Sequence, residues 1–281
     1  SERELFLEPK ITLQEQGTRL PPSGDAWMSY LLGESARGGH FRLESLQRVP
    51  QVNTPFIYRC LRTQRPQSAA LRVYWRDVDV LCRSGGLNES TAFIVQFGDA
   101  PPQALPHPVL VKSRPIAAAS APGAVVLPLH VDRHWASALM APESFVPWRH
   151  KRDALIWRGS TTGSGLRRDF VQDLSALRRA DIDVRFSAYQ HGRWHWLCAN
   201  QAHKCGKVCC PIHLSASLSR RELLHYRYLL SLEGHDVASN LKWLLGHNSV
   251  VLMPPPTVES WLLEGLLEPF VHYVPVHNAS Q

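Results

Sequence analysis

Two segments of the sequence place glycine, charged and hydroxyl side chains directly after an apolar run and directly before a helical pattern. In "YRYLLSLEGHDVASNLKW", Gly234 and Asp236 stand at this point. The first amide groups of a helix have no partner within the helix and carry partial positive charge, so an anion such as phosphate can bind there. The alternative is that Gly234 only turns the chain and that Asp236 only caps the helix.

The second segment, "ALIWRGSTTGSGLRRDF", repeats this design with Arg158, Gly159 and hydroxyl side chains between a strand pattern and a helix pattern. An arginine can hold two phosphate oxygens at once. Neither segment contains the Walker motif or the G-x-G-x-x-G motif, so simple ATPase chemistry and nicotinamide or flavin cofactors lack their usual signals. Two such segments together favour a ligand that carries phosphate.

The cysteines form a second group of candidate residues. Four of the six lie in residues 195–213, "HWLCANQAHKCGKVCCPIH", among three histidines. The composition is typical of a metal site, but the segment has no C-x-x-C pair, so a structural zinc, a disulfide and reduced thiols remain alternatives. Cys60 and Cys82 stand alone in the sequence and are expected to be small buried apolar side chains.

From Thr91 onward, short strand patterns alternate with helical patterns, and these elements must position the candidate residues. The expected strands are "TAFIVQF", "PVLVK", "AVVLPL", "ALIWRG", "IDVRF", "YRYLLSL", "SVVLM" and "VHYVPV". Helices are expected at residues 166–179, at 219–227 with a capping box from Ser219 to Glu222, and after Asp236 as its cap. The alternation predicts an α/β fold with a mostly parallel, doubly wound sheet, in which ligands bind at the carboxyl ends of the strands.

Composition sets the outer limits. The 281 residues are 44% hydrophobic and 20% charged, which suits one large core or two smaller ones. The net charge of +7 favours anionic partners and is compatible with peripheral membrane association. No nucleic-acid-binding pattern occurs, and no apolar run is long enough to cross a bilayer. The chain begins with Ser1 instead of Met, so a processed or truncated chain is expected, with a removed signal peptide left open.

Three stretches of the sequence resemble a known family. They are "WRGS", "IVQFGDAPPQALPHPVLVKSRPI" and the run from "YRYLLSLEGHDVASNLKW" to "HYVPV". They are similar to the CAP10-type glycosyltransferases, glycosyltransferase family 90, which include Rumi-like protein O-glucosyltransferases, capsule xylosyltransferases and bacterial lipopolysaccharide-modifying enzymes. The resemblance is strongest to the lipopolysaccharide-modifying branch. It covers about residues 90–276, and residues 226–276 are its most specific part.

The resemblance implies a GT-B-like fold with two Rossmann-like halves. Residues 1–90 would form a loop-rich or helical N-terminal segment. Residues 91–150, with part of 1–90, would form the acceptor-side half, and residues 151–281 a donor-binding half that is truncated at its C-terminus. The implied reaction moves a hexose or pentose from a nucleotide sugar, UDP-linked in most members, to a hydroxyl of a glycan, lipopolysaccharide or protein. It inverts the anomeric carbon and needs no metal or other cofactor.

The resemblance also implies site residues. Asp99 in "VQFGDAPP" matches the catalytic base of the family, and a carboxylate can take the proton of an attacking hydroxyl; the alternative is that Gly-Asp only forms a turn. The expected donor-binding residues are Arg158, Gly159, Ser160, Gly234, His235, Asp236, Ser239, Asn240, Lys242 and Glu259. The loop residues His130, Arg133 and His134 could meet the acceptor or the sugar, or could be solvated.

Two departures from the family pattern keep other functions open. Asn240 stands where Rumi-like enzymes carry an arginine, so the diphosphate would depend on Arg158, Lys242 and the helix N-terminus. The chain also ends at Gln281, soon after "HYVPV". The alternatives are a degenerate, non-catalytic sugar-nucleotide or glycan-binding protein and a zinc-organised interaction module at 195–213. A bacterial enzyme would be cytoplasmic, at the inner membrane face, and a eukaryotic one would lie in the ER or Golgi lumen.

Overall fold

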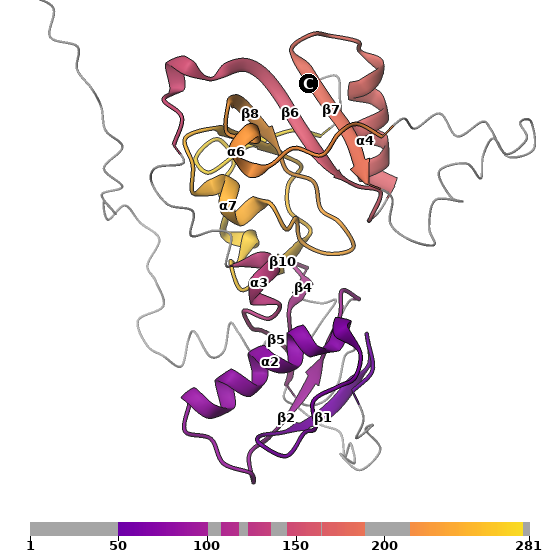
Figure 1. The fold of residues 1–281 in the computed structure, drawn as a ribbon, viewed down its shortest axis with the longest axis vertical. Helices are drawn as coiled ribbons and strands as arrows, with labels where there is room; N and C mark the ends of the chain where they lie inside the picture. The colour runs from indigo at the N-terminus through magenta and orange to yellow at the C-terminus, as the bar shows by residue number, and fades with distance from the viewer. Residues whose placement is uncertain are drawn as a thin grey trace, which may run out of the picture.

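The fold is described from a computed structural model, which covers residues 50–100, 108–117, 123–135, 145–163, 165–188 and 214–277. Two main sheets lie at opposite ends of the described structure in space, with α3, β4 and β10 between them (Figure 1). The cysteine and histidine segment 195–213 and residues 1–49 lie outside the described residues. The interpretations placed on those two segments therefore remain predictions.

The N-terminal sheet has the strand order β1-β2-β3-β5. Its strands are β1 (Pro55–Arg59), β2 (Ala92–Gln96), β3 (Val109–Val111) and β5 (Ala124–Val126). β1 is antiparallel to β2, whereas β2, β3 and β5 are mutually parallel. The carboxyl ends of the three parallel strands therefore meet at one edge of the sheet.

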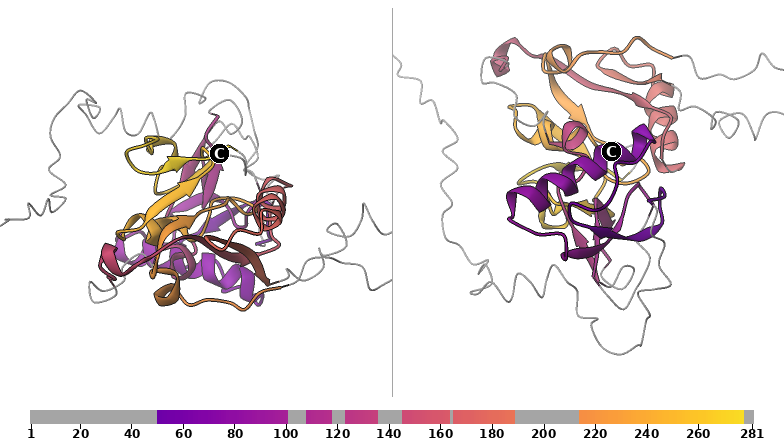
Figure 2. Two further views of the ribbon diagram at one scale, coloured as in Figure 1. Left: turned by 90° about the horizontal axis from the view of Figure 1, so that it is seen from above. Right: turned by 60° about the horizontal axis from the view of Figure 1, so that its bottom comes forward.

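One long helix, α2 (Ala69–Ser84), packs on this sheet (Figure 2). Its buried side chains recur every three to four residues, as expected for an amphipathic helix, and include Leu71, Tyr74, Val78 and Cys82. They contact buried residues of β1 and β2 in one core. The expectation that Cys60 and Cys82 are isolated was wrong, because the two are joined by a disulfide that links the end of β1 to the last turn of α2. Both cysteines are nevertheless fully buried.

The C-terminal sheet is wholly parallel, with the order β11-β9-β8-β6-β7. Its strands are β6 (Arg152–Ser160), β7 (Ile182–Ala188), β8 (Tyr226–Leu230), β9 (Val250–Met253) and β11 (Val274–Pro275). From β6 the chain first adds β7 on one side and then continues with β8 on the other. The strand order therefore reverses between β6 and β8. In open parallel sheets this reversal point opens a crevice at the carboxyl ends of the two strands.

The C-terminal sheet is covered on both faces. On one face Trp157, Val184 and Leu230 pack with side chains of α4 (Gly165–Ala176). On the other face Ile156, Leu229 and Val251 pack with α7 (Leu241–Leu245). Neighbouring residues of a strand point to opposite faces, so the apolar runs of β6 and β8 supply both cores.

Short elements complete the described part of the fold. They are α3 (Val131–His134), η4 (Trp148–His150), α6 (Arg220–Leu223) and η5 (Glu264–Leu266). A two-stranded antiparallel sheet of β4 (Ser113–Pro115) and β10 (Val258–Ser260) connects the two halves. Across it, Arg114 and Glu259 form a buried ion pair at 2.8 Å. Among the described residues, no helix is long and apolar enough to cross a membrane.

Comparison with the sequence predictions confirms a mixed α/β fold with mostly parallel sheets. All eight expected strands are present, and α4 and the capping box of Ser219 and Glu222 are confirmed. The helix expected after Asp236 was placed wrongly, because α7 begins only at Leu241 and Asp236 does not cap it. The sequence analysis missed β1 and α2.

Candidate active site

The carboxyl ends of strands from both sheets line one cleft. From the N-terminal sheet come Asp99 after β2, Lys112 after β3, and Arg133 and His134 after β5. From the C-terminal sheet come the loops after β6 and β8. The predicted residues that line the cleft are Asp99, Arg158, Gly159, Ser160, Gly234, His235, Asp236, Ser239 and Asn240. The fold thus brings together residues predicted separately from distant segments.

The loops after β6 and β8 touch through their backbones at the reversal point of the sheet. Gly163 has φ +99, a conformation that favours glycine, and a Cβ there would lie 2.6 Å from the carbonyl oxygen of Gly234. Gly234 does not have a positive φ, but a Cβ on it would lie 3.1 Å from Arg167 Nη2. Close packing therefore requires glycine at position 163, whereas a side chain at position 234 would need Arg167 to move by a few tenths of an ångström.

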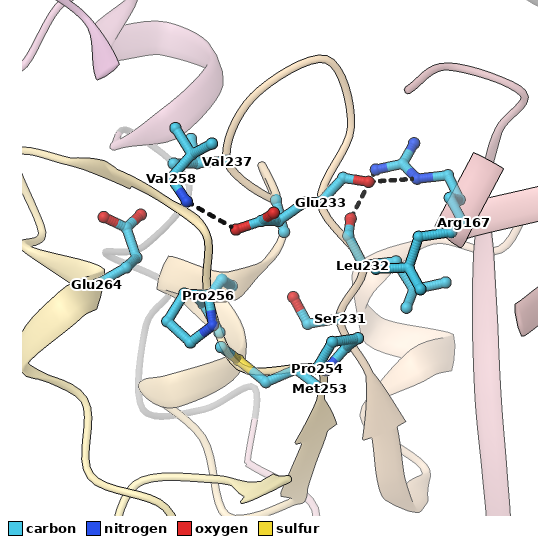
Figure 3. A pocket seen from close by; sticks show the side chains of 13 residues that line it. Arg167, Ser231, Leu232, Glu233, Val237, Met253, Pro254, Pro256, Val258 and Glu264 are labelled. Atoms are coloured by element: carbon cyan, nitrogen blue, oxygen red, sulfur yellow. Dashed lines mark hydrogen bonds between the residues drawn. The ribbon is translucent and has the colours of Figure 1, made fainter. Parts of the chain in front are cut away.

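Arg167, in the first turn of α4, holds these two loops together. Its guanidinium donates to the carbonyl of Leu232 at 2.6 Å and to the carbonyl of Glu233 at 2.9 Å (Figure 3). It also donates to Thr162 Oγ1 at 2.6 Å. A longer bond reaches the carbonyl of Ser160. All these acceptors are uncharged, and burial, followed by the positive charge of Arg133, lowers the pKa of Arg167 to about 10. Within the described residues, no carboxylate bonds to this half-buried guanidinium, although the charges of Asp236 and Glu233 act on it from a distance.

Arg158 differs from Arg167 in this respect. Its Nη2 pairs with Asp183 Oδ2 at 2.6 Å, and its other nitrogens donate to the carbonyls of Trp157, Asp183 and Ala216. Arg158 lines the cleft, but its charge is compensated by β7. The sequence analysis missed Arg167, although its place in "GLRRDF" at the start of a helix that follows a glycine loop was a usable signal.

On the opposite wall, Lys112 bridges two carboxylates that come from different sheets. Its Nζ contacts Asp99 Oδ1 and lies 2.6 Å from Asp236 Oδ2, which also accepts from Ser113 Oγ at 2.9 Å. Burial lowers the pKa of Lys112, but the interactions with Asp236, Tyr74 and Asp99 raise it by more. The net pKa therefore lies above the ordinary value, and the ammonium stays charged. Asp236 is thus a structural partner of Lys112 instead of a helix cap.

Asp99 keeps one oxygen available. Both of its hydrogen bonds within the described residues, from Lys112 and from Tyr74 at 3.2 Å, go to Oδ1. Its side chain is 39% exposed. Burial raises the pKa of Asp99, but Lys112 and the Tyr74 hydroxyl outweigh burial, so the net pKa lies below the ordinary value. Asp99 is therefore an ionised carboxylate whose Oδ2 accepts no hydrogen bond from the part of the chain that the structure describes.

The turn that carries Asp99 is built around Gly98. This glycine has φ +121, and a Cβ on it would lie 2.1 Å from Asn53 Oδ1. The same oxygen accepts from the backbone nitrogen of Ala100 at 3.1 Å. A neighbouring cavity of about 670 Å³ also reaches Asp99 and is lined by Tyr74, His130 and Arg133, among other residues. Asp99 is thus part of a turn and also stands where two cavities meet.

Two predicted donor-binding residues lie outside the cleft lining. Lys242 pairs with Glu264 at 3.0 Å, and both side chains are buried. Glu259 pairs with Arg114 between β10 and β4. The geometry gives these two residues a structural part in joining elements. Asn240, which lines the cleft, uses its side chain to bond the end of β8, at Ser231 Oγ and the Leu230 carbonyl.

Within the described ranges, no group of three or more histidine, cysteine, aspartate or glutamate residues is arranged to hold a metal ion. The segment 195–213 lies outside these ranges, so its zinc interpretation stays a prediction.

Comparison with known proteins identifies the family of the chain. Residues 131–281 match the profile of glycosyl transferase family 90. The chain is 35% identical over 216 residues to the O-glucosyltransferase LpsA of Dichelobacter nodosus. The matched region covers 76% of this chain and 57% of that protein. It is 28% identical over 150 residues to the uncharacterized protein 027R of Frog virus 3 (isolate Goorha), covering 48% of this chain and 16% of that protein. The chain thus spans only part of the length of these relatives. The family match and the identity to LpsA show that the chain belongs to glycosyl transferase family 90.

Proposed function

We propose that the chain is an inverting glycosyltransferase that moves a sugar from a UDP-linked donor to the hydroxyl of an acceptor. The observation that carries the proposal is the shared cleft, in which an ionised Asp99 faces two glycine loops held by Arg167. The name of the relative from Dichelobacter nodosus, an O-glucosyltransferase, supports glucose as the first donor sugar to test.

In the proposed reaction the acceptor oxygen attacks the anomeric carbon of the sugar. The new carbon–oxygen bond forms as the bond from that carbon to the β-phosphate oxygen breaks. Asp99 Oδ2 takes the acceptor proton, a contribution of about 10²- to 10⁴-fold in rate. The electron pair of the broken bond leaves with UDP, whose developing negative charge is stabilised by the positive charge of Arg167.

The same proposal assigns each of the two main sheets to one half of a GT-B arrangement. The N-terminal sheet would carry the acceptor side with the base, and the C-terminal sheet would carry the donor at its reversal point. Support comes from the strand order, since β6 and β8 flank the position where ligands of doubly wound sheets bind. The acceptor would enter through the neighbouring cavity beside Tyr74, His130 and Arg133 and would be a glycan, lipopolysaccharide or protein hydroxyl.

A donor screen tests the proposal. Purified protein is incubated with UDP-glucose, UDP-xylose or UDP-galactose, with and without candidate acceptors, and UDP release is measured. Acceptor-dependent UDP release with one sugar is the expected result. Binding of UDP without turnover on any tested acceptor would instead favour the non-catalytic sugar-nucleotide-binding alternative, and absence of both binding and release would contradict both functions.

A further inference from the structure

His134, at the end of α3, is a buried polar side chain that has no hydrogen-bond partner among the described residues. It is 3% exposed, it lines the cleft, and neither of its ring nitrogens has a hydrogen-bond partner in the described part of the chain. Its backbone position is set by α3, which starts after His130 in a left-handed conformation with φ 58. Most buried polar side chains in proteins are hydrogen-bonded, so an unpaired one that faces a cleft indicates a missing partner.

The surroundings of His134 restrict what that partner is. Burial lowers the pKa of the imidazole to about 2, and the positive charges of Lys112 and Lys242 act in the same direction. His130 and Arg133 also oppose its protonation. A neutral imidazole has one nitrogen that donates and one that accepts. This combination suits uncharged hydroxyl groups and gives no charge with which to neutralise phosphate.

The position of His134 in the cleft indicates which hydroxyls these are. Under the proposed function, the anomeric carbon lies between the diphosphate at the glycine loops and the acceptor oxygen at Asp99. The sugar ring must then occupy the part of the cleft between Gly234 and Asp99. His134 lines this cleft together with those two residues, but it does not line the neighbouring cavity on the acceptor side.

We propose that His134 is a specificity-determining residue that hydrogen-bonds one or two hydroxyl groups of the donor sugar. This inference rests on the proposed function and deepens it. The two ring nitrogens have no hydrogen-bond partner among the described residues, so a sugar hydroxyl that reaches them supplies bonds that this part of the chain does not. An analogue without that hydroxyl leaves them unpaired, which is the basis of strong discrimination in polar sites.

The test uses His134→Phe and His134→Gln with UDP, UDP-glucose and the monodeoxy analogues of UDP-glucose as ligands. Phenylalanine keeps a flat ring but removes both polar atoms, whereas glutamine keeps a donor and an acceptor. His134→Phe should weaken UDP-glucose binding by roughly tenfold or more and leave UDP affinity unchanged. The natural chain should discriminate against at least one monodeoxy analogue, His134→Phe should lose that discrimination, and His134→Gln should regain part of it.

Thermal stability gives a second measurement that separates recognition from structure. His134→Phe breaks no hydrogen bond within the described residues, so the melting temperature without ligand should be unchanged or higher. Equal losses of UDP and UDP-glucose affinity together with a lower melting temperature would overturn the inference. Unchanged UDP-glucose affinity in His134→Phe would also overturn it and leave the proposed function intact. If the natural chain binds UDP but no UDP-sugar, both proposals fail.

Discussion

The loops on the C-terminal sheet are held by a backbone contact and by one guanidinium that bonds their carbonyl groups, whereas the residues on the N-terminal sheet are held by an ammonium that lies between two carboxylates. Gly163 packs on Gly234, and Arg167 bonds backbone carbonyls of both loops. On the other wall, Lys112 joins Asp99 to Asp236. Backbone geometry is rigid and insensitive to pH, while a carboxylate and ammonium network also sets the protonation state of the proposed base. The comparison predicts different consequences for mutations on the two walls.

The largest expected effect separates chemistry from donor binding. Asp99→Asn keeps the size of the side chain but removes the proposed base, so transfer should fall by about two or more orders of magnitude. UDP affinity should change little, because the two glycine loops proposed to bind the diphosphate lie on the wall formed by the C-terminal sheet. Turnover and UDP affinity are measured on the same preparation. Transfer at the original rate would show that Asp99 only forms the turn after Gly98.

A change at Lys112 should damage both the base and the connection between the sheets. Lys112→Met leaves two carboxylates without their shared cation, and Asp236 is buried. The free energy of unfolding should fall by about 3 kcal/mol, measured by urea denaturation. Lys112→Arg, which keeps the charge, is the matched control and should lose less. Equal stability of Lys112→Met and the natural chain would contradict a structural role for the bridge.

A pair of arginine variants tests which cation serves the diphosphate. Arg167→Gln should weaken UDP binding by roughly 1.5 to 3 kcal/mol, because a positive charge beside the two glycine loops is lost. Arg158→Gln is the matched comparison and should cost less UDP affinity, since the charge of Arg158 is paired with Asp183. Calorimetric titration with UDP measures both. The reverse order would support the assignment of the diphosphate to Arg158 made from the sequence.

The glycine contact can be tested with two alanine variants. Gly163→Ala meets both a positive φ and the Gly234 carbonyl, and it should lower stability by about 1 to 3 kcal/mol and weaken UDP binding. Gly86→Ala is the control, since Gly86 also has a positive φ but a Cβ there meets nothing within 4 Å. It should cost only the φ strain, roughly 1 kcal/mol, with UDP binding unchanged. Equal effects of the two variants would rule out a tight contact between the loops.

The smallest expected effect is a shift in pH dependence. Asp99 acts as a base only when ionised, so activity is lost as the pH falls through its pKa, which lies below the ordinary value. Tyr74→Phe removes one hydrogen bond to the ionised form, so the pKa of Asp99 should rise and the acid limb of kcat/KM should move to higher pH. Lys112→Met should move it further in the same direction. A shift to lower pH in either variant would contradict this network.

The wall formed by the C-terminal sheet was the easier one to predict. Its strands are nearly continuous apolar runs. Each loop that lines the cleft from this sheet is recognisable by glycine and hydroxyl residues after a strand, so local patterns located Ser160 and Gly234. The helix after Asp236 was misplaced because the side chain of Asp236 bonds Lys112 and Ser113, which are more than a hundred residues away. Local capping rules contain no information on such a partner.

The N-terminal sheet was harder, since its main helix is interrupted by charges. In α2 the buried face includes Asp79 beside Leu71, Tyr74, Val78 and Cys82, and a charged residue on the apolar face weakens the visible helical pattern. The disulfide depends on the same helix, because only its register brings Cys82 to Cys60. Lys112 gave no local signal, as a lysine after a short strand is usually exposed. Its role becomes visible only when both sheets are in place.

The backbone contact between Gly163 and Gly234 also limits how donor preference can change in evolution. Each loop fills the space that an inserted residue or a larger side chain in the other would need. The two loops can therefore lengthen or shift only together, which requires coordinated changes in segments about seventy residues apart. Single substitutions that alter donor choice are expected at side chains that line the rest of the cleft. A library randomised at these two glycines should yield far fewer folded variants than one randomised at Ser239 or His235.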